Sequence, residues 1–201
     1  MSKIQPILII VSAPSGAGKT TLCDRLLDET SNMVYSVSCT TRAPRGEEVD
    51  GRSYCFLSED AFVSRVEAGA FLEHAIVHGH HYGTLRETIE SAMANGQSIL
   101  MDIDVQGAAQ IRDALAAAGP DDPIAGHWVD IFISPPSLEA LRKRLEGRAE
   151  DTPDVIEERL KNADAEMACA DAYRYTVIND DLNEAYKRLR EIVMREAGGE
   201  A

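Results

Sequence analysis

The feature that most constrains the fold of this chain is a short apolar run followed at once by a glycine-bearing turn. Residues 7–11 (Ile-Leu-Ile-Ile-Val) are uniformly apolar and mostly β-branched. Such a run predicts a strand buried on both faces, as in a parallel sheet. After the turn, Leu22, Leu26 and Leu27 recur at helical spacing within residues 20–29. The chain therefore begins as strand, loop and helix, the unit from which α/β folds are built.

The turn matches the core of the phosphate-loop pattern, Gly-x-Gly-Lys-Ser/Thr, in its expected place between a strand and a helix. Glycines let successive backbone N–H groups point at phosphate oxygens, and the helix N-terminus adds partial positive charge. Lys19 can reach the β- and γ-phosphates of a nucleotide, and the Thr20 hydroxyl can ligate Mg²⁺. The predicted ATP-binding loop consists of Ala13, Pro14, Ser15, Gly16, Ala17, Gly18, Lys19 and Thr20.

One position departs from the strict pattern, because Ala13 stands where the first glycine is expected. A residue that precedes proline is held in the extended region, where alanine is unstrained. The departure therefore leaves the phosphate-loop interpretation intact.

Further apolar runs and helical patterns alternate along the chain, which predicts a parallel sheet within an α/β fold. The predicted strands are residues 34–38, 98–103, 129–133 and 175–178. The predicted helices are residues 84–95, 106–118, 137–147, 153–170 and 182–196.

Two regions interrupt this alternation. Residues 38–83 are rich in Gly, Tyr, Thr and charge, and they predict a small mixed-β insertion with one helix near residues 58–69. Residues 137–170 predict two charged helices that form a mobile flap. Residues 119–126 (Gly-Pro-Asp-Asp-Pro-Ile-Ala-Gly) have loop composition, and the stretch 119–128 reads as a surface insertion without assigned function.

These patterns divide the chain into one core with two inserts. We expect a core of residues 1–37, 96–136 and 171–201, an insertion of residues 38–95 and a lid of residues 137–170.

The charge of the chain limits its partners. There are 34 acidic and 20 basic residues, a net charge of -14, which argues against nucleic acid and anionic membranes as partners. Residues 1–45 run against this trend, with five basic and three acidic side chains. An anion-binding site is therefore expected first in the N-terminal part.

The cysteines and the apolar runs predict a soluble cytoplasmic protein. The four cysteines, Cys23, Cys39, Cys55 and Cys169, show no metal-ligand spacing and are expected to be reduced thiols. No apolar run approaches the length of about 20 residues that a membrane span needs.

A second motif, within residues 40–56, suggests a second phosphate site. Arg42 and Arg45 lie three residues apart, and Tyr54 follows them. Arginine offers a planar fork to phosphate, and a tyrosine hydroxyl adds a donor. Taken alone, the motif also fits a basic surface hairpin.

Together, the phosphate loop and residues 40–56 resemble the guanylate kinase family. The resemblance covers nearly the whole chain in order through further short motifs, at residues 71–74, 81–84, 101–107, 135–137, 145–148 and 179–181. It implies a P-loop three-layer α/β fold with a central parallel sheet, a small mixed-β GMP-binding insertion and a helical lid. It also implies transfer of the γ-phosphoryl group of MgATP to GMP, and to dGMP, in purine nucleotide metabolism.

The resemblance implies a guanine site in the insertion. Glu73 would accept hydrogen bonds from guanine N1 and N2, and Ser38 would donate to O6. Adenine presents a lone pair at N1, so a carboxylate there would repel AMP. Arg42, Arg45, Tyr54 and Tyr82 would hold the GMP phosphate, while Thr84 and Asp104 would complete the base site. Capping of the helix that follows remains an alternative role for Asp104.

On the ATP side, the resemblance implies that Asp102 faces Mg²⁺ or its waters and that Asn179 lies near adenine. Catalysis would then rest on positioning and charge neutralisation. The residues that would neutralise charge on the phosphates are Lys19, Arg42, Arg144, Arg148 and Arg159.

Two alternatives stay open at this point: a catalytically inactive guanylate-kinase-like interaction scaffold, and a related kinase that acts on another acceptor. An inactive scaffold should show a damaged phosphate loop and missing lid arginines, whereas Lys19 and Arg144 are present. Residues Ser38 and Glu73 argue against another acceptor. The sequence leaves open whether the protein is a monomer or a homo-oligomer.

Overall fold

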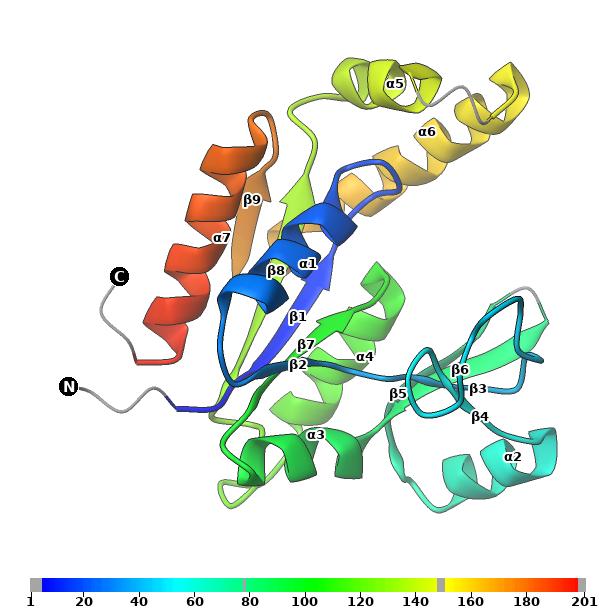
Figure 1. The fold of residues 1–201 in the computed structure, drawn as a ribbon, viewed down its shortest axis with the longest axis vertical. Helices are drawn as coiled ribbons and strands as arrows, with labels where there is room; N and C mark the ends of the chain where they lie inside the picture. Colours follow the sequence, from blue (N-terminus) through cyan, green and yellow to red (C-terminus); the bar gives the residue numbers. More distant parts are fainter. Residues whose placement is uncertain (1–4, 78, 148–150, 199–201) are drawn as a thin grey trace.

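The computed structural model describes residues 5–77, 79–147 and 151–198 (Figure 1). A five-stranded parallel sheet of order β2-β7-β1-β8-β9 lies at its centre. The strands of this sheet are β1 (Leu8–Ser12), β2 (Met33–Tyr35), β7 (Ser98–Asp102), β8 (Trp128–Ser134) and β9 (Tyr175–Ile178). The predicted α/β class with a parallel sheet is confirmed.

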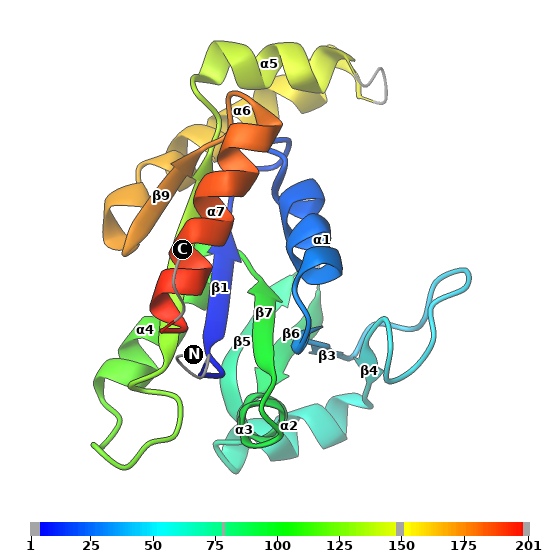
Figure 2. The ribbon, with the colours of Figure 1, turned by 60° about the vertical axis from the view of Figure 1, so that its left-hand side comes forward.

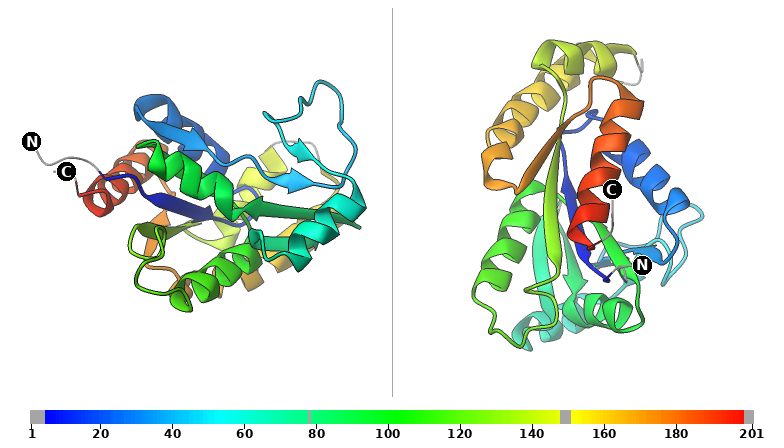
Figure 3. Two further views of the ribbon diagram at one scale, coloured as in Figure 1. Left: turned by 90° about the horizontal axis from the view of Figure 1, so that it is seen from below. Right: turned by 90° about the vertical axis from the view of Figure 1, so that its left-hand side faces the viewer.

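The alternation of side chains along β1 explains the three layers. Ile9 and Val11 face a cluster that includes the helices α1 and α7, while Leu8 and Ile10 face a second cluster on the other side. All four side chains are fully buried, as the apolar run predicts. Figure 3 shows helices on both faces of the sheet. The flanking helices are α1 (Lys19–Glu29), α3 (Arg86–Ala94), α4 (Val105–Ala116) and α7 (Leu182–Glu196).

A second sheet, of four strands in the order β4-β3-β6-β5, lies beside the central one (Figure 1). It is mixed, because β3 pairs with β4 in parallel but with β6 antiparallel. Its elements, with the neighbouring helix, are β3 (Cys39–Thr40), β4 (Cys55–Phe56), α2 (Glu59–Glu67), β5 (Phe71–Val77) and β6 (His80–Leu85). The mixed-β insertion with one helix is thus confirmed.

Two predicted boundaries in this region are wrong. The strand expected at residues 34–38 ends at Tyr35, since the chain leaves the central sheet there and enters the small sheet at Cys39. The helix expected from Thr84 begins at Arg86, because Thr84 pairs with Glu73 in the β5–β6 ladder. Strand pairing therefore overrides the helical periodicity at Thr84.

Helices α5 (Leu138–Gly147) and α6 (Pro153–Met167) form the charged helix pair that the sequence predicts. Their contact is a small apolar cluster of its own, separate from the two clusters of the core. Figure 2 shows both helices above the carboxyl end of β1. Helix α6 ends three residues earlier than predicted, and the 3₁₀ turn η1 (Ala170–Ala172) follows. Met167 and Ala170 pack against the core.

The segment between α4 and β8 has turns, as its composition predicts, but it is not a purely superficial insertion. Ile124 is fully buried in the core cluster beside α4. Asp122 accepts hydrogen bonds from the backbone N–H groups of Ile124 and Ala125 and pairs with Arg86 at 2.8 Å. The segment is therefore anchored to α3. Within the described part of the chain, no helix is both long and apolar enough to cross a membrane.

Candidate active site

The phosphate loop connects the fully buried β1 to the N-terminus of α1. Gly16 and Gly18 adopt φ angles of 87° and 92°, a region that favours glycine. A Cβ atom on Gly18 would collide with the side-chain amide of Asn179, which donates to the Ala17 carbonyl at 2.7 Å. Asn179 is buried, and this hydrogen bond supports the backbone of the loop. The family resemblance implies only an adenine contact for Asn179, and that contact remains a prediction.

The loop faces a cavity of about 390 Å³, which Lys19, Thr20, Asp102 and Glu166 help to line. The Lys19 ammonium pairs with the Asp102 carboxylate. Burial lowers the pKa of Lys19 from its ordinary value. Glu166 enters from α6, and burial raises the pKa of its carboxyl group, with repulsion from Asp104 as a further cause. Glu166 was not predicted, because a carboxylate on a charged helix carries no spacing signal.

The lid arginines differ in their surroundings. Arg144 donates to the Asn179 carbonyl at 2.6 Å and lines a cavity of about 380 Å³ with Gly16 and Gly18. Arg159 pairs with Asp151 at 3.1 Å, within the lid itself. Arg148 lies outside the described residues. The structure therefore brings Arg144 to the phosphate loop and leaves Arg159 in contact with its own segment.

A third cavity, of about 220 Å³, lies between the small sheet and β7. Glu73, on β5, is only 8% exposed at its edge. Burial raises the pKa of the Glu73 carboxyl group, and a hydrogen bond from the Thr84 hydroxyl opposes this shift. The Ser38 and Thr84 hydroxyl oxygens are 3.5 Å apart. Predicted guanine-site residues that line this cavity are Ser38, Tyr54, Glu73, Tyr82 and Asp104.

Asp104 lines this cavity and also caps a helix. Its carboxylate accepts hydrogen bonds from the backbone N–H groups of Gln106 at 3.0 Å and Gly107 at 2.8 Å. It is therefore the N-cap of α4, and its contact with guanine remains a prediction. A Cβ atom on Gly107 would lie 3.3 Å from Glu73 Oε2, so the first turn of α4 also lies close to the buried carboxylate.

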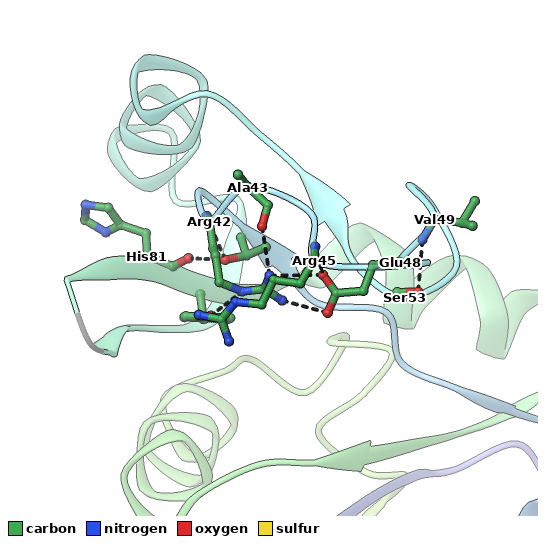
Figure 4. A network of polar contacts seen from close by, with 9 residues as sticks. Arg42, Ala43, Arg45, Glu48, Val49, Ser53 and His81 are labelled. Carbon is green, nitrogen blue, oxygen red and sulfur yellow. Dashed lines mark hydrogen bonds and ion pairs between the residues drawn. The ribbon is translucent and has the colours of Figure 1, made fainter.

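The predicted phosphate clamp is organised by a residue that the sequence reasoning missed, Glu48 (Figure 4). Arg42 donates through Nη2 and Nη1 to the two Glu48 carboxylate oxygens, at 2.8 and 3.0 Å. Its Nε donates to the Tyr82 hydroxyl at 3.1 Å. Glu48 also accepts from the backbone N–H of Arg45 at 2.8 Å. The Arg42 guanidinium thereby holds the pKa of the Glu48 carboxyl below its ordinary value.

The other clamp residues surround this pair. Tyr54 meets Tyr82 edge-on, with ring centroids 5.9 Å apart, and the Arg42 guanidinium lies 5.3 Å from the Tyr54 centroid. Arg45 is exposed. No spacing in the sequence predicts the role of Glu48, because its contact with Arg42 depends on how residues 42–48 turn.

Asp102 lies between the phosphate-loop cavity and the cavity of Glu73, which are called here the donor half and the acceptor half of the site. It lines both the phosphate-loop cavity and the cavity of Glu73. It lies at the carboxyl end of β7, the edge at which open α/β sheets bind ligands. The site can therefore place a nucleoside triphosphate and a second nucleotide on either side of one carboxylate.

Comparison with known proteins decides the family. The model of the guanylate kinase family matches residues 5–196. The chain belongs to the guanylate kinase family. It is 43% identical over 194 residues to guanylate kinase from Geobacter metallireducens, covering 96% of this chain and 91% of that protein.

Two further relatives agree. The chain is 47% identical over 186 residues to guanylate kinase from Polaromonas sp., covering 92% of this chain and 85% of that protein. The crystal structure of guanylate kinase from Anaplasma phagocytophilum superposes with a TM-score of 0.70 at 33% identity. That comparison covers 97% of this chain and 88% of the Anaplasma chain.

Membership of the guanylate kinase family confirms the resemblance, the fold and the ATP:GMP phosphotransferase activity that the motifs predict. Nothing in the described residues favours an inactive scaffold: the phosphate loop is intact and Arg144 lies beside it. Most predicted site residues meet in the two cavities that share Asp102, and the individual roles of these residues remain proposals.

Proposed function

We propose that this guanylate kinase family member transfers the γ-phosphoryl group of ATP in line to a phosphate oxygen of GMP, or of dGMP, across Asp102. The single observation that supports this most is that Asp102 lines both the phosphate-loop cavity and the cavity of the buried Glu73. The acceptor oxygen is already anionic, so no strong general base is needed. Catalysis then consists of positioning and charge neutralisation.

Guanine is selected in the small cavity. The Glu73 carboxylate accepts hydrogen bonds from guanine N1–H and the 2-amino group, and the Ser38 hydroxyl donates to O6. Thr84 supports this arrangement, because its hydroxyl bonds to Glu73 and lies 3.5 Å from Ser38. Asp104 lies on the side of the 2-amino group, with its orientation fixed by capping α4. Burying Glu73 against adenine would leave a carboxylate without a donor, which disfavours AMP.

The GMP phosphate is held by the clamp of Arg42, Arg45, Tyr54 and Tyr82. Glu48 orients the Arg42 fork and the turn that carries Arg45. Four of the five N–H groups of the Arg42 guanidinium already have acceptors, on Glu48, Tyr82 and the Ala43 carbonyl. Glu48 is therefore a positioning residue, because it fixes where Arg42 meets the phosphate.

On the donor side, the loop amides hold the β-phosphate and Lys19 neutralises the transferred group. Arg144 adds positive charge from the lid, and we propose that Arg148 and Arg159 join it when the lid closes. The lid residues are suited to such movement, since α5 and α6 share an apolar cluster separate from the core. Closure would exclude the water that otherwise hydrolyses ATP.

The donor cavity fits Mg²⁺. This ion binds through hard oxygen ligands and usually takes one or two protein groups together with substrate phosphates. The Thr20 hydroxyl and the Asp102 carboxylate line the same cavity as the loop and supply oxygens of that kind. When bound with ATP, Mg²⁺ would neutralise charge on the β- and γ-phosphates.

An ADP-release assay with GMP, dGMP, AMP, CMP and UMP as acceptors tests this assignment. We expect turnover with GMP and dGMP and little with the other three. The Glu73→Gln variant should lose most of its guanine preference, whereas Glu67→Gln, at the exposed end of α2, should keep it. Unchanged preference in Glu73→Gln would remove Glu73 from the base site.

A further inference from the structure

Two cysteines that the proposed mechanism does not use lie directly opposite each other. Cys39 on β3 and Cys55 on β4 are register partners in a parallel ladder. Backbone hydrogen bonds of 2.9 Å on both sides of the pair, from Cys55 N–H to Ser38 and from Leu57 N–H to Thr40, fix this register. Burial and the neighbouring Cys55 thiol raise the pKa of Cys39 to about 12. Both thiols are free.

The cysteine pair faces away from the guanine cavity. Successive side chains of a strand point to opposite faces of the sheet. Ser38 and Tyr54 line the guanine cavity, while Cys39 and Cys55 line a different cavity of about 310 Å³. Leu85, Ala92 and Ile99 also line that second cavity. Cys39 is fully buried and Cys55 is half-buried, so a small reagent meets Cys55 first.

The chain between the two cysteines carries the proposed phosphate clamp. Residues 40–54 include both arginines of the clamp, Glu48 and Tyr54. A bond between the two sulfur atoms would close this segment into a loop. The pair is therefore placed to act on the acceptor site without touching the phosphate loop.

We propose that Cys39 and Cys55 are a modification site, at which a low-molecular-weight disulfide of the glutathione type converts the two thiols into a reversible intramolecular disulfide. Neighbouring strands lie about 4.8 Å apart, within the Cα separation of about 4.4–6.8 Å that disulfides span. The Cβ atoms of a disulfide lie about 3.8 Å apart, so the two strands must tilt toward each other on this face.

The chemistry takes place by two exchange steps. The Cys55 thiolate attacks one sulfur of the small disulfide, a mixed disulfide forms, and one small thiolate leaves. The Cys39 sulfur then attacks the Cys55 sulfur and displaces the second small thiolate, which takes up the Cys39 proton. The two cysteines are oxidised by two electrons, and one small disulfide is reduced to two thiols.

The consequence for activity rests on the proposed acceptor site. A tilt of β3 and β4 would move Ser38 and Tyr54, which immediately precede these strands and line the guanine cavity. Displacements of about 1 Å in a positioned site can cost about 100-fold in rate. We therefore expect the oxidised protein to have a KM for GMP raised at least about tenfold, with KM for ATP unchanged.

The first test maps the bond itself. The full-length protein is equilibrated in buffers of reduced and oxidised glutathione, alkylated and digested with trypsin without reduction. Cleavage after Arg42, Arg45 and Arg52 separates the two cysteines unless a disulfide joins their peptides. A linked Cys39–Cys55 peptide, also formed in a Cys23→Ala/Cys169→Ser variant, supports the proposal. Only a glutathione adduct, or a disulfide through Cys23, Cys169 or a second chain, overturns it.

The second test measures the effect. Oxidation should raise KM for GMP in the wild type, dithiothreitol should reverse it, and Cys55→Ser should abolish the response while keeping the activity of the reduced protein. Cys39→Ala serves as a second variant, with the same expected loss of response. A mapped disulfide that leaves KM for GMP unchanged contradicts the proposed effect on the clamp. Failure of the guanine site assignment would appear separately, in the acceptor panel with reduced protein.

Discussion

The phosphate loop and the acceptor clamp recognise the same chemical group but are built in different ways. The loop presents backbone N–H groups at the end of β1, whose side chains are fully buried, and the buried Asn179 braces it. The clamp uses side chains on the segment between β3 and β4, in which residues 43–47 are exposed. Its geometry depends on the ion pair between Arg42 and Glu48.

This difference predicts how substitutions near the phosphate loop and in the acceptor clamp affect the enzyme. A loop that binds through its backbone keeps its shape when a neighbouring side chain is removed, so such a change affects the chemistry more than the fold. A clamp built from side chains changes its geometry when a central ion pair such as Arg42–Glu48 is altered. Variants on the two sides should therefore affect kcat and KM differently.

The largest expected effect is on the donor side. Lys19→Ala removes the cation that neutralises the transferred group, so kcat should fall by about 10³-fold or more. Coupled assays of ADP and GDP formation measure the loss, and circular dichroism should show an unchanged fold. Lys143→Ala, on the exposed face of α5, is the matched control. Undiminished turnover in Lys19→Ala would remove Lys19 from the mechanism.

A smaller but still large effect is expected in the guanine cavity. Glu73→Gln replaces an acceptor with an amide that presents a donor to guanine N1–H, so kcat/KM for GMP should fall by about 100-fold. KM for ATP should stay within about twofold of the wild-type value. Steady-state kinetics with each nucleotide varied in turn separate the two effects. A parallel rise in KM for ATP would show that the two halves are not independent.

The clamp should respond more moderately. Glu48→Gln removes the charge that fixes the Arg42 fork, and we expect KM for GMP to rise about tenfold with little change in kcat. Glu47→Gln alters the exposed neighbouring carboxylate and serves as the control. If both variants behave like the wild type, Glu48 does not position the clamp.

The smallest expected effect concerns stability and pH. Burial raises the pKa of Glu73, so its ionised form opposes folding, and stability is lost as the pH rises through the folded-state pKa. Glu73→Gln should therefore raise Tm at neutral pH, by about 2–4 °C for each kcal/mol gained. The gain should vanish in acid, below the ordinary glutamate pKa of about 4.3. Calorimetry at both pH values checks this, and a lower Tm at neutral pH would contradict it.

Acid should also lower the efficiency with which the enzyme uses GMP. GMP needs the ionised Glu73, whose raised pKa makes the carboxyl group protonate at a higher pH than an exposed glutamate. The value of kcat/KM for GMP should therefore decline on acidification before the ordinary glutamate range is reached. The Glu73→Gln variant should lack that decline.

Local patterns predicted most of the fold and the phosphate loop, because the strongest of them rest on backbone requirements. The guanine-site residues came from the family resemblance, and their roles remain proposals. The buried β1 run and the glycine turn need no knowledge of distant contacts, and both are confirmed. The boundary at Thr84 was missed because pairing with β5 overrides helical spacing. Glu48 and Glu166 were missed because their roles depend on which side chain they meet in space.

Asn179 is a residue that the sequence identified but whose structural contact it did not predict. Sequence motifs placed it in the nucleotide site, but its bond to the Ala17 carbonyl depends on β9 ending beside the phosphate loop. The resemblance gave the residue and a role near adenine, whereas its supporting contact is visible only in the structure.

The measurement that most directly tests the division between the two halves is a direct binding titration of GMP and of ATP to Lys19→Ala and Glu73→Gln. We predict that Lys19→Ala binds GMP within about twofold of the wild-type Kd, while Glu73→Gln loses GMP binding by about 100-fold and keeps its affinity for ATP. Loss of GMP binding in Lys19→Ala, or wild-type GMP binding in Glu73→Gln, would contradict the account.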